Sequence, residues 1–138
     1  MAKVVLIDSG ALVATLLRRD RHHEWAKDLL GRLPPPFVTC EAVISETIFL
    51  LGSNGIAKES FLHMLERGAL RLAPDFSGGV AELTRLMRRY ADTPMSFADA
   101  CLVRLSELHS DSVVLMLDSD FLVYRRNGRQ RIPTLMPR

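Results

Sequence analysis

Short apolar runs alternate along the chain with longer segments of helical periodicity. The apolar runs predict buried strands at Lys3–Ile7, Phe37–Thr39, Leu70–Leu72 and Val113–Leu117, and an edge strand at Ile132–Leu135. The periodic segments predict helices from Ser9 or Gly10 to Leu17, Arg21–Leu33, Thr39 or Cys40 to Gly52, Ala57–Arg67, Ser77–Tyr90 and Phe97–Leu108, with a helical turn at Asp118–Val123. Strands that alternate with helices indicate an α/β fold, with a short central parallel sheet and helices on both faces.

The size and composition of the chain are those of one globular domain. Its 138 residues, 48% apolar and 25% charged, predict a single domain over residues 1–138. The two cysteines, Cys40 and Cys101, are far apart, which excludes a disulfide scaffold and a thiolate zinc site. No apolar run approaches the roughly 20 residues of a membrane span, and the N-terminal one is too short for a signal peptide. We therefore expect a cytoplasmic protein.

The net charge of +2 hides an uneven distribution along the chain. Residues 121–138 contain five arginines and no acidic residue, so the remainder carries a net charge of −3. A basic tail on an acidic body indicates a polyanionic partner for the tail. A solvated C-terminus explains the same charge equally well.

Two predicted strands end directly in aspartate. Lys3–Ile7 runs into Asp8, and Val113–Leu117 runs into Asp118, with Asp120 two residues further on. Ligands of open parallel sheets bind beyond the carboxyl ends of the strands. If the two strands are neighbours, about 4.8 Å apart, their carboxylates share one crevice. Alternatively, Asp8 or Ser9 caps the following helix and Asp118 starts a turn.

Glu46 falls among apolar residues of its predicted helix. It lies one turn from Ala42, Val43, Phe49 and Leu50, which predicts that it points to the apolar face. A carboxylate buried there costs several kcal/mol unless it is paired or bound to a metal ion. A buried arginine partner is the alternative to a metal ion.

The segment from Ser96 to Asp99 allows two interpretations. It reads as a capping box, in which a negative charge in the first helical turn is favourable. The functional interpretation is that the Asp99 carboxylate points from the helix start into the crevice.

A group of four or five carboxylates has a characteristic chemistry. Ligands that are all oxygen favour Mg²⁺ or Mn²⁺ over zinc. The four histidines show no metal-binding spacing, and no Ser-His-Asp arrangement is evident. The natural reaction of such a group is phosphodiester hydrolysis by a metal-activated water.

At these residues the sequence resembles the PIN-domain ribonucleases, most closely the VapC-type toxins of bacterial toxin–antitoxin pairs. The matching segments occur in order and extend the resemblance over about residues 3–135: Val5-Leu6-Ile7-Asp8-Ser9-Gly10-Ala11-Leu12, Ile44-Ser45-Glu46, Ser96-Phe97-Ala98-Asp99-Ala100 and Leu117-Asp118-Ser119-Asp120-Phe121. One departure is Met116, where the family often has Thr or Ser.

The resemblance implies a three-layer PIN-like fold with a metal cluster. The implied catalytic and metal-binding residues are Asp8, Glu46, Asp99 and Asp118, with Asp120 as a fifth metal ligand. Ser9 is implied to place a hydroxyl and a helix N-terminus beside the metal. Family members of this type form homodimers, and their toxins are blocked by an antitoxin protein whose tail fills the active-site groove.

The sequence thus favours an Mg²⁺- or Mn²⁺-dependent endoribonuclease. The resemblance implies that it is the toxin of a toxin–antitoxin pair, and a housekeeping role in RNA processing is the open alternative. Its RNA backbone contacts are expected from Arg125, Arg126, Arg129 and Arg131. The alternative is a non-catalytic RNA-binding or protein-interaction domain of the same fold, which Met116 favours. A phosphotransferase of the haloacid dehalogenase or receiver type is disfavoured. Gly10 stands where the first type has its second aspartate, and the paired acids of the second type are missing ahead of the end of the first strand.

Overall fold

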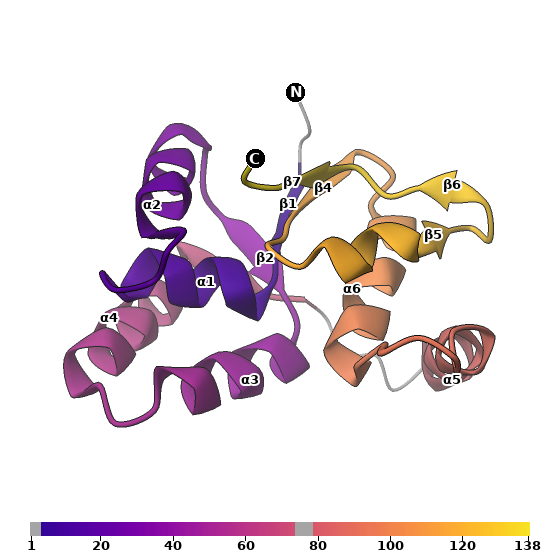
Figure 1. Cartoon of the computed structure of the whole chain (residues 1–138), viewed down its shortest axis with the longest axis horizontal. Coiled ribbons are helices and arrows are strands. Elements are labelled where there is room, and N and C mark those ends of the chain that lie inside the picture. The colour runs from indigo at the N-terminus through magenta and orange to yellow at the C-terminus, as the bar shows by residue number, and fades with distance from the viewer. Residues whose placement is uncertain (1–3, 74–78) are drawn as a thin grey trace.

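The centre of the molecule is a five-stranded parallel sheet with the order β3-β2-β1-β4-β7. The computed structural model describes residues 4–73 and 79–138. The strands of this sheet are β1 (Val4–Ile7), β2 (Phe37–Thr39), β3 (Leu70–Leu72), β4 (Ser112–Leu115) and β7 (Thr134–Leu135). Helices flank the sheet, so the predicted α/β class is confirmed (Figure 1).

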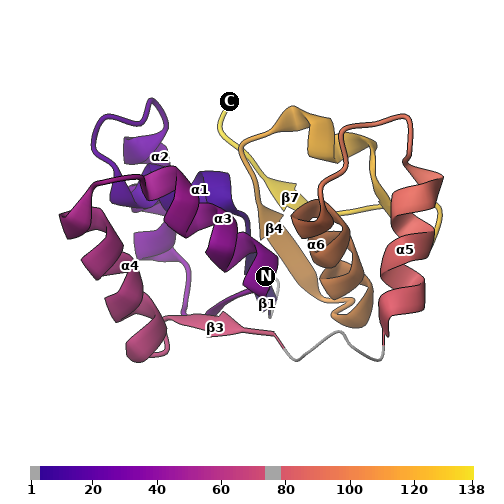
Figure 2. The ribbon, with the colours of Figure 1, turned by 90° about the horizontal axis from the view of Figure 1, so that it is seen from below.

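Two groups of helices lie on opposite sides of the central strands (Figure 2). One group comprises α1 (Ser9–Leu16), α2 (His23–Arg32), α3 (Glu41–Leu51) and α4 (Gly55–Glu66). The other comprises α5 (Val80–Arg89) and α6 (Phe97–Leu108), followed after β4 by the short 3₁₀ helix η2 (Ser119–Val123). Leu83 and Leu86 of α5 are buried, as its amphipathic pattern predicts.

Strands β1 and β4 are the neighbours that the acidic residues require. They pair in parallel, with Val5 opposite Val113 and Ile7 opposite Leu115. Leu6, Ile7 and Leu115 are completely buried, in keeping with parallel strands covered on both faces. The carboxyl ends of β1 and β4 therefore lie side by side, and the segments that follow them start from one edge.

The structure differs from the sequence-based expectations at several boundaries. Strand β4 spans Ser112–Leu115 rather than Val113–Leu117, so the chain leaves the sheet before Asp118. Helix α5 is described from Val80; the expected start at Ser77, like the expected strand residue Lys3, lies outside the described residues. The edge strand expected at Ile132–Leu135 is shorter in the structure, where β7 spans only Thr134–Leu135.

A two-stranded antiparallel hairpin, absent from the sequence-based expectations, follows η2. It consists of β5 (Arg125–Arg126) and β6 (Gln130–Arg131). Asn127 and Gly128 are the central residues of its turn, with φ values of 53° and 80°, and Arg129 completes the connection to β6. Asn-Gly is the sequence that such a hairpin turn prefers, because both central residues need positive φ.

Two further expectations concern cysteines and membranes. Cys40 and Cys101 are both buried as free thiols, and the fold brings their side chains into contact although they are far apart in the sequence. Within the described ranges, the helices are too short or too polar to cross a lipid bilayer.

Candidate active site

Two of the predicted acidic residues are placed by the ends of β1 and β4. The amide of Asp8 donates to the carbonyl of Leu115, at 3.2 Å, which fixes Asp8 at the edge where β1 ends. Asp118 follows β4 and caps η2, because its Oδ1 accepts a hydrogen bond from the amide of Asp120 at 2.9 Å. The predicted turn at Asp118 is therefore present. Asp8 likewise occupies the N-cap position of α1, although its side chain makes no capping hydrogen bond.

Glu46 does not lie on the buried face of α3, which corrects the sequence-based expectation. The buried residues of this helix are Val43, Thr47 and Leu51, one turn apart along a different face. Phe49, which suggested an apolar face around Glu46, is 81% exposed. Glu46 is itself exposed, so it needs no buried arginine partner.

The carboxylate of Glu46 instead accepts a hydrogen bond from the hydroxyl of Ser9. Ser9 is buried at the first position of α1. Its side chain is therefore directed away from solvent and toward α3. The resemblance implies that the Ser9 hydroxyl lies beside a metal ion. In the structure this hydroxyl orients the carboxylate of Glu46, which belongs to the same site.

Asp99 both completes a capping box and lines a cavity, so the two interpretations of its segment hold together. Its amide donates to the Ser96 hydroxyl at 3.0 Å, and its Oδ2 accepts from the Ser96 amide at 3.0 Å, which completes the capping box. The same side chain lines a cavity at the start of α6. Capping uses one oxygen of the carboxylate, and the structure gives the other no hydrogen-bond partner among the described residues.

All five predicted acidic residues line one cavity of about 250 Å³ at the carboxyl edge of the sheet. Its lining residues are Asp8, Glu46, Pro94, Ser96, Asp99, Met116, Asp118, Asp120, Phe121 and Tyr124. None of these described lining residues is basic. Of three larger cavities, those of about 630 and 560 Å³ have no acidic lining residue, and the one of about 400 Å³ balances Glu24 and Asp28 with Lys27 and Arg32. Chemistry rather than size therefore distinguishes this site.

Burial, with a smaller effect of neighbouring negative charges, changes the acidity of the site. Burial raises the pKa of Asp8 to about 7, and the charges of Asp99 and Glu46 add to this effect. Burial also raises the pKa of Asp99, against the opposing hydrogen bonds from Ser96. Crowded carboxylates with no nearby cation hold protons in this way.

The arrangement offers oxygen ligands but does not form a closed metal site. Among the described residues, no three His, Cys, Asp or Glu side chains form a group that could hold a metal ion as they stand. The carboxylates of Glu46, Asp99 and Asp118 are each held by a hydrogen bond from their own surroundings. Their chemistry nevertheless fits a hard divalent cation, because all the donors are oxygens and the cavity lacks a positive charge.

The four predicted arginines lie outside the cavity lining. Arg125 and Arg126 are half-buried and donate to backbone carbonyls of their own chain, whereas Arg129 and Arg131 are exposed. Met116, the departure from the family pattern, is buried and lines the cavity.

The sequence-based expectations missed Tyr124 as a cavity residue. Its buried ring packs edge-on against Tyr90 and Phe121, at centroid distances of 5.0 and 5.3 Å. Burial raises the pKa of its hydroxyl, and the nearby charge of Asp99 adds to this effect. Nothing in the local pattern marks Tyr124, because its place depends on how η2 folds back.

Comparisons with known proteins agree with this geometry. The family model described as "PIN domain" matches residues 5–127. The crystal structure of VapC20 from Mycobacterium tuberculosis, described as a sarcin–ricin loop cleaving toxin, superposes with a TM-score of 0.75 at 20% identity. The match covers 85% of this chain and 92% of that one. No curated protein sequence matches. With its matching family model spanning nearly the whole chain, the protein belongs to the PIN domain family.

Proposed function

We propose that the protein is a metal-dependent endoribonuclease that hydrolyses RNA phosphodiester bonds. The observation that carries this proposal is the cavity lined by five carboxylates and no basic side chain. Membership of the PIN domain family supports it. The raised pKa of Asp8 supports it further, since a divalent cation would supply the missing positive charge.

Asp8, Glu46, Asp99 and Asp118 are the proposed catalytic and metal-holding residues, with Asp120 as a fifth ligand. A bound Mg²⁺ or Mn²⁺ supplies charge neutralisation on the phosphate and activation of water. Because no three ligands are arranged to hold an ion as they stand, cation binding has to draw these side chains inward. Ser9 orients Glu46 for this role, and the Ser96 amide orients Asp99.

We further propose that the chain is the toxin of a toxin–antitoxin pair, with RNA as substrate and an antitoxin protein as inhibitor. The likeness in fold to VapC20, described as cleaving the sarcin–ricin loop, supports this role. A cytoplasmic location is in keeping with an RNA substrate and with two free cysteines. A small open reading frame next to the gene is the expected sign of an antitoxin.

A homodimer is the proposed assembly. Ile48, Phe49 and Leu50 of α3 are 39%, 81% and 47% exposed, and neighbouring apolar residues of this kind favour a protein partner. Light scattering should report a dimer for the natural chain and a monomer for Phe49→Asp. A monomeric natural chain would contradict the dimer without affecting the nuclease proposal.

Cleavage of total RNA tests the proposed function. The natural protein should cut RNA with Mg²⁺ or Mn²⁺ and not with chelator, and Asp99→Asn should lose the activity. Asp111→Asn is the matched control, because Asp111 is exposed just before β4, at the far end of that strand from Asp118. If the natural protein cut no RNA with either cation, the non-catalytic RNA-binding alternative would replace the nuclease.

A further inference from the structure

The β5–β6 hairpin turns one face toward α6 and the other toward solvent. Neighbouring side chains of a strand point to opposite faces, and paired residues share a face. Arg126 pairs with Gln130, and Arg125 pairs with Arg131. The Arg126 guanidinium donates to the Ser106 carbonyl of α6 at 3.4 Å, so its face lies on the helix. The opposite face carries Arg125 and Arg131.

The fold uses only some of the hairpin arginines. Arg125 donates to the carbonyls of Leu122, at 2.7 Å, and Tyr124, at 3.1 Å. Arg129, in the turn, and Arg131 are exposed, and neither guanidinium has a hydrogen bond or ion pair with another described residue. We name Arg125, Arg129 and Arg131 the hairpin arginine face.

This face has unfavourable electrostatics on its own. Arg125 and Arg131 stand directly opposite each other across the two strands. Like charges at such positions destabilise a hairpin. Residues 121–138 contain no acidic side chain, and Glu107 of α6, the carboxylate that contacts the hairpin, binds the Asn127 amide in the turn and pairs with Arg104. An anion bound from outside would relieve the repulsion.

The rest of the protein holds the hairpin in a fixed position. The amide of Asn127 donates to Glu107 of α6 at 2.7 Å, and Arg89 of α5 donates to the Gly128 carbonyl at 2.6 Å. At its other end, the Arg125 amide donates to the Tyr90 hydroxyl at 2.9 Å. These contacts restrict the movement of the hairpin backbone that carries the arginines.

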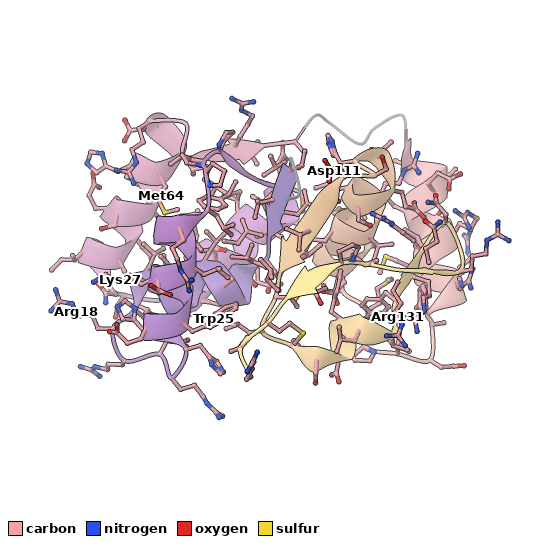
Figure 3. All side chains as sticks on the ribbon, turned by 90° about the horizontal axis from the view of Figure 1, so that it is seen from above. Arg18, Trp25, Lys27, Met64, Asp111 and Arg131 are labelled. Atoms are coloured by element: carbon pink, nitrogen blue, oxygen red, sulfur yellow. The ribbon has the colours of Figure 1, made fainter. Side chains whose placement is uncertain are left out.

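The hairpin arginine face begins where the acidic cavity ends. Tyr124 lines that cavity, and Arg125 follows it in the chain. In Figure 3, Arg131 lies on the half of the molecule that contains α5 and α6, away from Arg18 and Lys27. Arg125 is therefore the arginine of this face that directly follows the cavity lining in the chain.

We propose that the hairpin arginine face binds phosphates of the RNA strand next to the scissile bond. This inference rests on the proposed nuclease function. It assigns sequence-independent contacts, because guanidinium–phosphate pairs position a strand without reading its bases. An RNA strand is the proposed occupant rather than an acidic protein, because its regularly spaced phosphates would extend from the proposed cleavage site toward these arginines.

Salt-dependent binding of an oligonucleotide tests the inference. The double variant Arg129→Gln/Arg131→Gln is compared with the natural chain and with Arg67→Gln/Arg71→Gln, which removes two exposed arginines near β3. Fluorescence anisotropy follows a labelled oligouridylate of about 15 nucleotides in chelator, which prevents cleavage. The hairpin variant should bind several-fold more weakly, and its log–log salt slope should fall by about 1.4, or roughly 0.7 per lost contact. The control should keep the natural slope and affinity.

Three results would overturn the inference: an unchanged salt slope in the hairpin variant, an equal loss in the control, or equally tight binding of a polyglutamate peptide to the natural chain. Thermal unfolding of both double variants verifies that the comparison is between folded proteins. Metal-dependent cleavage by the natural protein is measured separately. If cleavage is present while the hairpin variant binds normally, only this inference fails; if cleavage is absent, the proposed function itself fails.

Discussion

The hydroxyl of Ser9, at the start of α1, donates a hydrogen bond to the carboxylate of Glu46, in the middle of α3. Ser9 is buried and Glu46 is exposed. The bond thus joins the helix that follows Asp8 to the helix that supplies Glu46. Its geometry makes Ser9 a positioning residue for the acidic cavity.

Replacing Ser9 with alanine should impair cleavage more than stability. Loss of one hydrogen bond lowers the free energy of unfolding by about 1 kcal/mol. Loss of a group that orients a metal ligand typically lowers activity or metal affinity by about 10–100-fold. Cleavage rates and Mn²⁺ affinity measure the effect. Ser45→Ala, on the exposed neighbour of Glu46, is the control and should behave like the natural protein.

The stability of the metal-free protein should fall as pH rises. Because the pKa of Asp8 is raised from 3.8 to about 7, the folded state binds a proton that the unfolded state releases near pH 4. The stabilisation is full below that pH and is lost as pH rises toward about 7.

Asp8→Asn should remove this dependence. Between about pH 4 and pH 8 in chelator, the variant should gain up to about 4 kcal/mol relative to the natural chain. Urea unfolding at each pH measures the difference. Parallel curves for the two proteins would show that Asp8 titrates normally in the folded state.

Gly128→Ala should destabilise the β5–β6 hairpin. The residue has a φ of 80°, and an added Cβ would lie 3.1 Å from the Arg89 guanidinium. Alanine at positive φ costs about 1–2 kcal/mol. Gly79→Ala is the matched control, since Gly79 has a φ of −112° and an added Cβ would lie within 4 Å of no atom in the described part of the chain. The control should change the free energy of unfolding by less than about 1 kcal/mol. Equal stabilities of the two variants would contradict this account of the turn.

The sequence predicted the strands and the order of the acidic residues, because buried β-branched runs and helical periodicity are local signals. Leu6 and Ile7 show this, as both are completely buried in β1. The sequence alone could not establish that β1 and β4 are neighbours. The structure establishes it, because Ile7 of β1 pairs with Leu115 of β4. Local pattern gives the elements, whereas the sheet order depends on contacts between distant segments.

The errors also have physical reasons. Phe49 and Leu50 are exposed, so apolar neighbours were misleading about the environment of Glu46. The Asn127-Gly128 pair is typical of a hairpin turn, but the predicted elements do not include a hairpin there. No pattern could separate Arg125, held by backbone carbonyls, from the exposed Arg131, because that difference arises from how η2 ends.

Calorimetric titration with Mn²⁺ at about pH 8 tests the central claim most directly. The account predicts that the natural chain binds the cation, that Asp99→Asn binds at least about tenfold more weakly, and that Asp111→Asn, whose site is labelled in Figure 3, binds like the natural chain. Absence of binding to the natural chain, or equal binding by Asp99→Asn, would contradict a divalent cation site among these carboxylates.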